Sequence, residues 1–144
     1  MPKVEFEDIS AVDDGLLEYA VIVSNYNGKW IYCKHKNRDT WEIPGGKREP
    51  KEPILSTAKR ELFEESGAAD YELTPVCAYC VVGDTKSYGL LCYAHINTLG
   101  PLPTSEIDHI QLFEDEPQLL TYPHIQPFLF AKVKGWLAKD TITP

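Results

Sequence analysis

The acidic residues Glu61, Glu64 and Glu65 are spaced as i, i+3 and i+4 along the chain. At about 100° per residue, an α-helix would place all three carboxylates within an arc of roughly 100°. Three negative charges on one stripe of a helix repel one another, and a bound cation would relieve that repulsion. Carboxylate oxygen is the ligand that Mg²⁺ and Mn²⁺ prefer in proteins. The spacing therefore indicates a helix that binds Mg²⁺ or Mn²⁺ along one face.

The segment around these glutamates carries the start and stop signals of a helix. Pro53 suits the first turn, where its missing N–H costs nothing, and Gly67 suits the position just past the C-terminus. An apolar stripe beside the acidic one would bury against a sheet. This stripe consists of Ile54, Ala58 and Leu62. We expect a helix from about Pro53 to Ser66, with a core face and a metal-binding face side by side.

A glycine-containing loop precedes this helix. Gly45 and Gly46 follow a short strand end at Trp41–Ile43, and glycines let the backbone approach a ligand closely. Lys47 comes next and is a candidate for contact with phosphate, whereas Arg48 is at least equally well explained as a solvated surface charge. The loop and the acidic helix face together are suited to holding a divalent metal against a phosphate.

Residues 46–68 resemble the Nudix box, GX5EX7REUXEEXGU, in which U is a bulky aliphatic residue. The positions that agree are Gly46, Glu52, Arg60, Glu61, Leu62, Glu64, Glu65 and Gly67. Ala68 departs from the pattern, because a larger aliphatic residue is usual there, and we expect weaker packing under the helix end with the chemistry intact. The alternative, an acidic amphipathic helix with a solvated face, would leave the glycines and Arg60 as coincidences.

The resemblance implies both a fold and a reaction. The fold class is α/β, an α/β/α sandwich with a mixed β-sheet between helices, formed by one domain of residues 1–144. Nudix enzymes hydrolyse a nucleoside diphosphate linked to another group. Water attacks phosphorus, and Mg²⁺ or Mn²⁺ holds the phosphates and stabilises the developing charge.

The resemblance also implies roles for the acidic residues. Glu64 and Glu65 would be direct metal ligands, and the carbonyl of Gly45 would complete the metal's shell. Glu61 would be either a further ligand or the base that activates water. A carboxylate outside the box often assists in this family; Glu106 is the candidate and Asp108 the second choice, with solvated loop acids as the alternative.

Other candidate residues would position or bind the substrate. Arg60 would pair with a box carboxylate and fix its orientation, because a guanidinium holds carboxylates well. Glu52 would be an indirect or more distant ligand, and with Lys47 it is counted among the residues that contact the substrate. Trp41 is a candidate for stacking on a base. Core packing is the alternative for this tryptophan and for Tyr88, Tyr122 and Phe128.

The lead-in WEIPGGK at Trp41–Lys47 resembles the MutT branch, which hydrolyses nucleoside triphosphates, including oxidised dGTP, to the monophosphate and pyrophosphate. Branches that prefer ADP-ribose often carry a proline about fifteen residues past the box. Gly83-Asp84 occupies that region here. We expect a nucleoside triphosphate pyrophosphohydrolase. The alternatives are a hydrolase of ADP-ribose or another nucleoside diphosphate derivative, and a nucleotide-binding module without catalysis.

Length and composition agree with a small globular enzyme. The chain has 144 residues, 43% of them hydrophobic, and a net charge of −8, which does not attract nucleic acid polymers. No apolar run approaches the roughly 20 residues that span a bilayer, and the N-terminus lacks the features of a signal peptide. We expect a cytoplasmic protein, a monomer or homodimer, whose partner is a small-molecule nucleotide rather than a nucleic acid or a membrane.

Cys77 and Cys80 form a CxxC motif, which is found in zinc and redox sites. Residues three apart in a strand point to opposite faces, so two thiols in the expected strand cannot chelate one ion. We expect reduced, buried cysteines, and a fold stabilised by zinc is the weaker alternative. The histidines show no metal-ligand spacing and are expected at the surface or the edge of the core. They are His35, His95, His109 and His124.

Hydrophobic patterning predicts the remaining elements. A hairpin is expected from strands at 16–24 and 29–35, with the turn at Asn25–Gly28. Further strands are expected at 71–82, 88–97 and 107–114, and a second helix at 122–138. Together with the acidic helix, these elements predict a sheet between helices.

Overall fold

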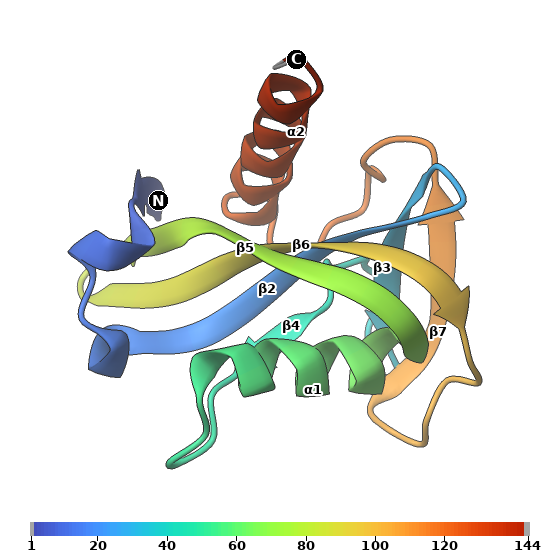
Figure 1. The fold of residues 1–144 in the computed structure, drawn as a ribbon. Helices are drawn as coiled ribbons and strands as arrows, with labels where there is room; N and C mark the ends of the chain where they lie inside the picture. The colour runs from blue at the N-terminus through green and yellow to red at the C-terminus, as the bar shows by residue number, and fades with distance from the viewer. Residues whose placement is uncertain (1, 143–144) are drawn as a thin grey trace.

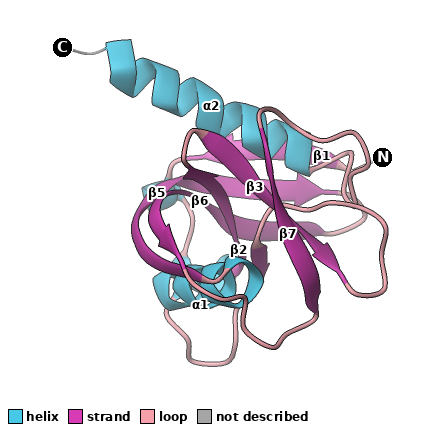
Figure 2. Ribbon diagram, turned by 90° about the vertical axis from the view of Figure 1, so that its right-hand side faces the viewer, coloured by secondary structure: helices cyan, strands magenta, loops and turns pink. Residues whose placement is uncertain are grey.

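Two helices cover opposite faces of one mixed β-sheet (Figures 1 and 2). The computed structural model describes residues 2–142. Its main elements are β1 (Lys3–Glu7), β2 (Leu17–Tyr26), β3 (Lys29–His35), β4 (Gly45–Lys47), α1 (Ile54–Ser66), β5 (Ala68–Val82), β6 (Lys86–Leu99), β7 (Ile107–Phe113) and α2 (Gln126–Ile142). Two short 3₁₀ turns lie between β1 and β2. The expected α/β/α sandwich with a mixed sheet between helices is confirmed.

The sheet has the order β1-β5-β6-β2-β3-β7, and β4 pairs with β2 off this path. Strands β2 and β6 run parallel, and the other pairs of strands in the described residues run antiparallel. Residues 20–24 of β2 are all buried, as expected for a central strand covered on both faces. This strand therefore lies under both helices and beside the segment that leads into α1.

Strands β2 and β3 form a hairpin in which only the residues next to the turn pair with each other. Asn27 and Gly28 have φ values of 53° and 78°, the left-handed pair that a tight two-residue hairpin turn requires. Only Asn25 and Tyr26 of β2 pair with β3, which then continues against β7. The first half of β2 is left to pair with β4, which holds the two glycines of the loop.

Each helix buries an apolar face against its side of the sheet. On the α1 side the core includes Ile54, Ala58 and Leu62 of the helix with Ile22, Leu90 and Ala94 of the sheet. On the α2 side it includes Leu129, Phe130 and Val133 with Val21, Val23 and Leu91. The apolar stripe predicted for the first helix is therefore its core face.

Two strands were not expected from the sequence. β1 is a short edge strand of alternating exposed and half-buried residues, a pattern too brief to stand out. β4 is formed by Gly45–Lys47, where glycine has low strand propensity and tertiary pairing decides the conformation. Helix α2 begins at Gln126, later than the expected residue 122, and Pro127 occupies its first turn. Within residues 2–142, neither helix is long and apolar enough to cross a bilayer.

The four cysteines are buried and free of disulfides, as expected. Cys77 belongs to the core on the α2 side. Cys80 interacts instead with Tyr88, which packs against the α1-side core. The two thiols of the CxxC motif thus lie on different faces of the sheet. Burial raises the pKa of the Cys77 thiol.

Candidate active site

Helix α1 begins after Pro53 and ends at Gly67, as the sequence signals indicate. Gly67 has φ 76°, in the left-handed region, and its N–H donates to the carbonyl of Phe63 at 2.9 Å. A Cβ at this position would lie 2.8 Å from the carbonyl oxygens of Gly100 and Pro101. Both the backbone angle and the space therefore require glycine where the acidic helix meets β5.

Glu65 is the most buried of the three helix glutamates, with 8% of its surface exposed. The N–H of Gly45 donates to its Oε1 at 2.9 Å, and the Cys33 thiol lies 3.8 Å from the same oxygen. Burial raises the pKa of Glu65 to about 8, the hydrogen bond from Gly45 opposes that rise, and the charge of Glu61 adds to it. The loop glycine thus binds the helix glutamate directly.

Glu61 lies against the backbone of Gly46. A Cβ built on Gly46 would overlap the Glu61 carboxylate, so any larger residue would force this carboxylate to move. Burial raises the pKa of Glu61 to about 7, the positive charge of Arg60 opposes this, and the neighbouring Glu64 adds to it. The two loop glycines therefore each serve one carboxylate of the helix.

Arg60 is held by Glu52 through two hydrogen bonds. Its Nε donates to Oε2 at 2.8 Å and its Nη2 to Oε1 at 3.0 Å, while the hydroxyl of Thr57 donates to Oε1 at 2.7 Å. These bonds lower the pKa of Glu52 to about 2. Nη1 of Arg60 also lies 3.1 Å from Oε1 of Glu64. The sequence-predicted pairing of Arg60 with a box carboxylate is present, with Glu52 as its bidentate partner.

His35 lies among three carboxylates, which the sequence did not indicate. Its Nε2 is 3.3 Å from Glu42 and 3.6 Å from Glu65, and its Nδ1 is 4.0 Å from Glu106. Glu42 is 7% exposed and accepts a hydrogen bond from Arg38 at 2.8 Å. The expectation for His35 named only the surface or the core edge. The one local signal for Glu42 was an acid between the apolar neighbours Trp41 and Ile43.

Glu106, the carboxylate chosen outside the box, faces the acidic helix. Its side chain is 92% exposed and lines a cavity of about 500 Å³ together with Glu61, Glu64 and Glu65. Asp108, the second choice, accepts a hydrogen bond from His109 at 2.7 Å on the exposed surface and does not line that cavity. The structure therefore brings the first choice, and not the second, to the box residues.

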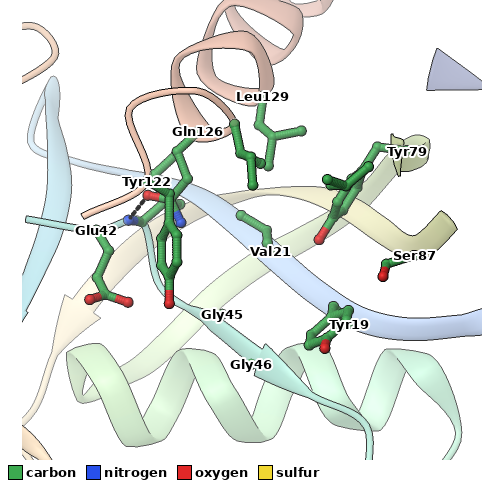
Figure 3. Close-up of a pocket in the computed structure, with 13 residues that line it drawn as sticks. Tyr19, Val21, Glu42, Gly45, Gly46, Tyr79, Ser87, Tyr122, Gln126 and Leu129 are labelled. Carbon is green, nitrogen blue, oxygen red and sulfur yellow. Dashed lines mark hydrogen bonds between the residues drawn. The ribbon is translucent and has the colours of Figure 1, made fainter. Parts of the chain in front are cut away.

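A second cavity, of about 360 Å³, adjoins the acidic one (Figure 3). Both cavities are lined by Glu42, Gly45, Gly46 and Tyr122. The second has aromatic and aliphatic walls from Tyr19, Val21, Tyr79 and Leu129, with Ser87 and Gln126 as polar groups. We call the cavity beside the helix glutamates the acidic cavity and this second one the aromatic cavity. The two meet at the glycine segment, and the volume of each suits a small molecule.

Three residues expected to contact the substrate, namely Trp41, Lys47 and Glu52, line neither of these two cavities. Trp41 packs edge-on against His109 and Phe113, with ring centroids 5.3 and 5.1 Å apart, and lines neither cavity. Lys47 is exposed and lines a third, more open hollow with Arg60 and Glu61. Its carbonyl accepts a hydrogen bond from Arg60 at 3.0 Å. Trp41 therefore takes part in packing, and Lys47 borders Glu61 from the other side.

The donor chemistry of this site fits a hard divalent ion. The carboxylates of Glu61, Glu64 and Glu65 all line the same cavity, and carboxylate oxygens are the ligands that such an ion prefers. Burial raises the pKa of Glu61 and of Glu65, and a bound cation would favour the charged form of both carboxylates. As the side chains stand, no three His, Cys, Asp or Glu residues within 2–142 form a ready metal cage. Glu64 instead faces Arg60.

The family model described as the NUDIX domain matches residues 17–127 of this chain. The chain belongs to the Nudix family. The match covers the box, the glycine segment, the central strands and the start of α2, and it includes every residue that lines the two adjoining cavities except Leu129. Members of this family generally use divalent metal ions and act on small-molecule nucleotides.

A relative from Bacillus subtilis (strain 168) is YtkD, to which 8-oxo-dGTP diphosphatase activity is provisionally assigned. This Nudix chain is 38% identical to it over 65 residues, which span 45% of this chain and 40% of that protein. The similarity in sequence thus concerns less than half of either protein.

Solved structures extend the likeness to most of the chain. A variant of the Bacillus subtilis pyrophosphohydrolase BsRppH is 25% identical, with a TM-score of 0.76 over 94% of this chain and 90% of that one. An ADP-ribose pyrophosphatase from Streptococcus suis is 15% identical, with a TM-score of 0.64 over 83% and 90%. A MutT Nudix hydrolase from Burkholderia pseudomallei is 21% identical, with a TM-score of 0.60 over 80% and 95%. The latter two share the fold.

Proposed function

We propose that this Nudix hydrolase is a metal-dependent pyrophosphohydrolase of nucleoside triphosphates, oxidised dGTP included. Its products would be the nucleoside monophosphate and pyrophosphate. The observation that carries the proposal is the shared glycine segment: Gly45 and Gly46 line both the acidic cavity and the aromatic one. A nucleoside triphosphate suits both cavities: its triphosphate, with the metal, would occupy the acidic cavity, and its base would occupy the aromatic cavity.

The relatives support the same reaction class. YtkD carries the assignment to 8-oxo-dGTP diphosphatase, and BsRppH is named as a pyrophosphohydrolase. The lead-in Trp41–Lys47, which resembles the MutT branch, lies in β4 and the bridge that precedes it. The structure similar to this chain that is named for ADP-ribose hydrolysis supports the fold and does not favour that substrate.

Mg²⁺ or Mn²⁺ would be held by Glu61, Glu64 and Glu65 with the carbonyl of Gly45. When bound, the ion supplies positive charge that polarises a phosphate oxygen and activates water. Arg60 would position the carboxylate of Glu64, because Glu52 binds the guanidinium of Arg60 while its Nη1 remains beside Glu64. Glu61 and Glu106 are the two candidates to accept the proton of the attacking water, since both line the acidic cavity.

A substrate panel tests the proposal. The purified protein is given ribo- and deoxynucleoside triphosphates, 8-oxo-dGTP, ADP-ribose, dinucleoside polyphosphates and nucleotide sugars, with Mg²⁺ or Mn²⁺, and products are identified by chromatography. We expect triphosphates to be cleaved to monophosphate and pyrophosphate, and activity to vanish with EDTA. A preference for ADP-ribose would overturn the substrate class while leaving the Nudix hydrolase intact.

The variant Glu64→Gln separates an enzyme from a binding module. Glu64 is half-buried at the acidic cavity, and its loss as a ligand should lower kcat by orders of magnitude. Glu72→Gln, at an exposed position of β5, is the matched control and should keep the wild-type rate. Equal turnover in Glu64→Gln and the wild type would show that catalysis does not depend on the Glu64 carboxylate.

We further propose that the substrate is a free nucleotide in the cytoplasm and that the active form is a monomer or homodimer. The net charge of −8 opposes binding to a nucleic acid polymer. Size-exclusion chromatography with light scattering measures the mass of the active species. A competition assay with long RNA or DNA should leave the rate of triphosphate hydrolysis unchanged.

A further inference from the structure

We propose that Gln126 makes the aromatic cavity selective for a 6-keto purine, through a hydrogen bond from its side-chain amide to the keto oxygen. This inference rests on the proposed function, because it assigns the base of the nucleotide that the site takes. It names a specificity-determining residue at the start of α2, outside the Nudix box.

The orientation of the Gln126 amide is fixed from the backbone. The N–H of Ile43 donates to Oε1 of Gln126 at 2.8 Å, and Gln126 is 6% exposed. If the amide were flipped, its NH₂ group would face another N–H donor, and the hydrogen bond would be lost. Oε1 must therefore face Ile43, and the NH₂ group must face away from it.

The NH₂ group of Gln126 is available to a ligand. Nε2 makes no hydrogen bond with any residue in the part of the chain that the structure describes, and it is not among the buried unpartnered atoms. Gln126 lines the aromatic cavity beside Tyr122 and Leu129 (Figure 3). The amide thus presents two N–H donors at the wall of a cavity that opens toward the acidic helix.

The other polar side chains of the cavity do not present a donor of fixed orientation. The hydroxyls of Tyr19, Tyr79 and Ser87 line the side of the cavity away from Gln126 (Figure 3), and a hydroxyl either donates or accepts. The carboxylate of Glu42 is engaged by Arg38 and lies beside His35. Gln126 is therefore the group whose donor character selects among bases.

The purines differ in what they offer to a pair of donors. Guanine and hypoxanthine carry two adjacent acceptors, O6 and N7, whereas adenine carries an N6 donor next to N7. A glutamine reads adenine by using its oxygen and its nitrogen together, and the oxygen of Gln126 is turned to Ile43. Adenine would set its amino group against the NH₂ of Gln126, donor against donor.

The test compares inosine triphosphate with ATP, which differ at the six position. We expect kcat/KM for inosine triphosphate to exceed that for ATP by about tenfold or more, the effect of one matched against one mismatched hydrogen bond. In Gln126→Glu, one oxygen still accepts from Ile43 and the other becomes an acceptor toward the base. The ratio should then fall at least tenfold and move toward ATP.

Gln118→Glu is the matched control, because it adds the same charge at an exposed residue that does not line the cavity. Its ratio should stay within twofold of the wild type. Equal rates for the two nucleotides in the wild-type protein would overturn the proposal. An unchanged ratio in a folded Gln126→Glu variant would overturn it as well.

Binding of the monophosphates IMP and AMP, measured by calorimetry with Mg²⁺, tests the inference without hydrolysis. We expect IMP to bind about tenfold more tightly than AMP. This result would support the role of Gln126 even if triphosphates were not cleaved, which would refute only the proposed function. Equal binding of IMP and AMP, together with normal triphosphate cleavage, would refute only the role of Gln126. If Gln126→Glu does not fold, the wild-type ratio and the binding measurement decide.

Discussion

The carboxylate of Glu61 rests directly on the backbone of Gly46, with no room for a Cβ between them. The contact joins the helix that supplies the acidic face to the strand that enters it, and the N–H of Gly45 makes a similar link to Glu65. The position of two carboxylates is thus set by adjacent glycines of one short strand. This dependence makes the glycines part of the site.

Replacing Gly46 with alanine should damage activity more than folding. The new methyl group would meet the flexible end of Glu61, which moves aside while the strand stays in place. We expect kcat to fall by about 100-fold, because a misplacement of roughly 1 Å at a reacting group has that effect. Steady-state kinetics and a thermal melt measure the two quantities. Gly83→Ala, where a Cβ meets only an atom 4.0 Å away, is the control. A Gly46→Ala enzyme with the wild-type rate would contradict the role of this contact.

The bond between Arg60 and Glu52 should make stability depend on acid pH. The pKa of Glu52 is lowered from 4.5 to about 2 in the folded protein. A lowered pKa contributes stability that is present above the unfolded value and is lost as the pH falls toward about 2. Thermal melts of the wild type and Glu52→Gln between pH 7 and pH 2 test this. The wild type should melt higher at pH 7, and the difference should shrink between pH 4.5 and 2. A constant difference would show that the carboxylate charge is not involved.

Two glycines at helix-associated positions should respond to alanine in opposite directions. Gly67→Ala should lower the free energy of unfolding by about 1–3 kcal/mol, because φ is 76° and two carbonyls lie close. Gly135→Ala, within α2 and with nothing near its Cβ, should raise it by about 0.5–1 kcal/mol. Urea unfolding of both variants gives the comparison. Two changes of the same sign would refute the backbone argument.

Trp41→Phe should reduce stability and leave substrate binding intact. The indole packs against His109 and Phe113 and lines neither of the two adjoining cavities. We expect the free energy of unfolding to fall by about 1–3 kcal/mol, with KM within twofold of the wild type. Kinetics with the best triphosphate and urea unfolding provide both values. A tenfold rise in KM without loss of stability would contradict the packing role and would indicate that Trp41 contacts the substrate.

The acidic helix could be predicted from sequence because its information is local. The spacing of Glu61, Glu64 and Glu65, the proline at the start and the glycine at the end all lie within one short segment. Each follows from helix geometry without knowledge of the sheet. For the same reason the bounds of α1 agree with the expectation almost to the residue.

The rest of the site depends on contacts between distant parts of the chain. His35 ends β3 and meets Glu65 only because β3 leaves β2 and pairs with β7. Gln126 reaches Ile43 across 83 positions of sequence. No spacing rule relates such residues, so neither their proximity nor the packing of Trp41 could be derived before the topology was known. The two unexpected strands, β1 and β4, have the same origin.

The pairing of β4 with β2 sets Ala20 opposite Gly46 and Val21 opposite Gly45. A slip of one residue along β2 would replace one glycine by Lys47 or Pro44 and would invert the faces of the strand. Either change would place bulk under Glu61 or withdraw the N–H that Glu65 accepts. The register of three residue pairs between β4 and β2 therefore determines where both carboxylates of the acidic helix lie.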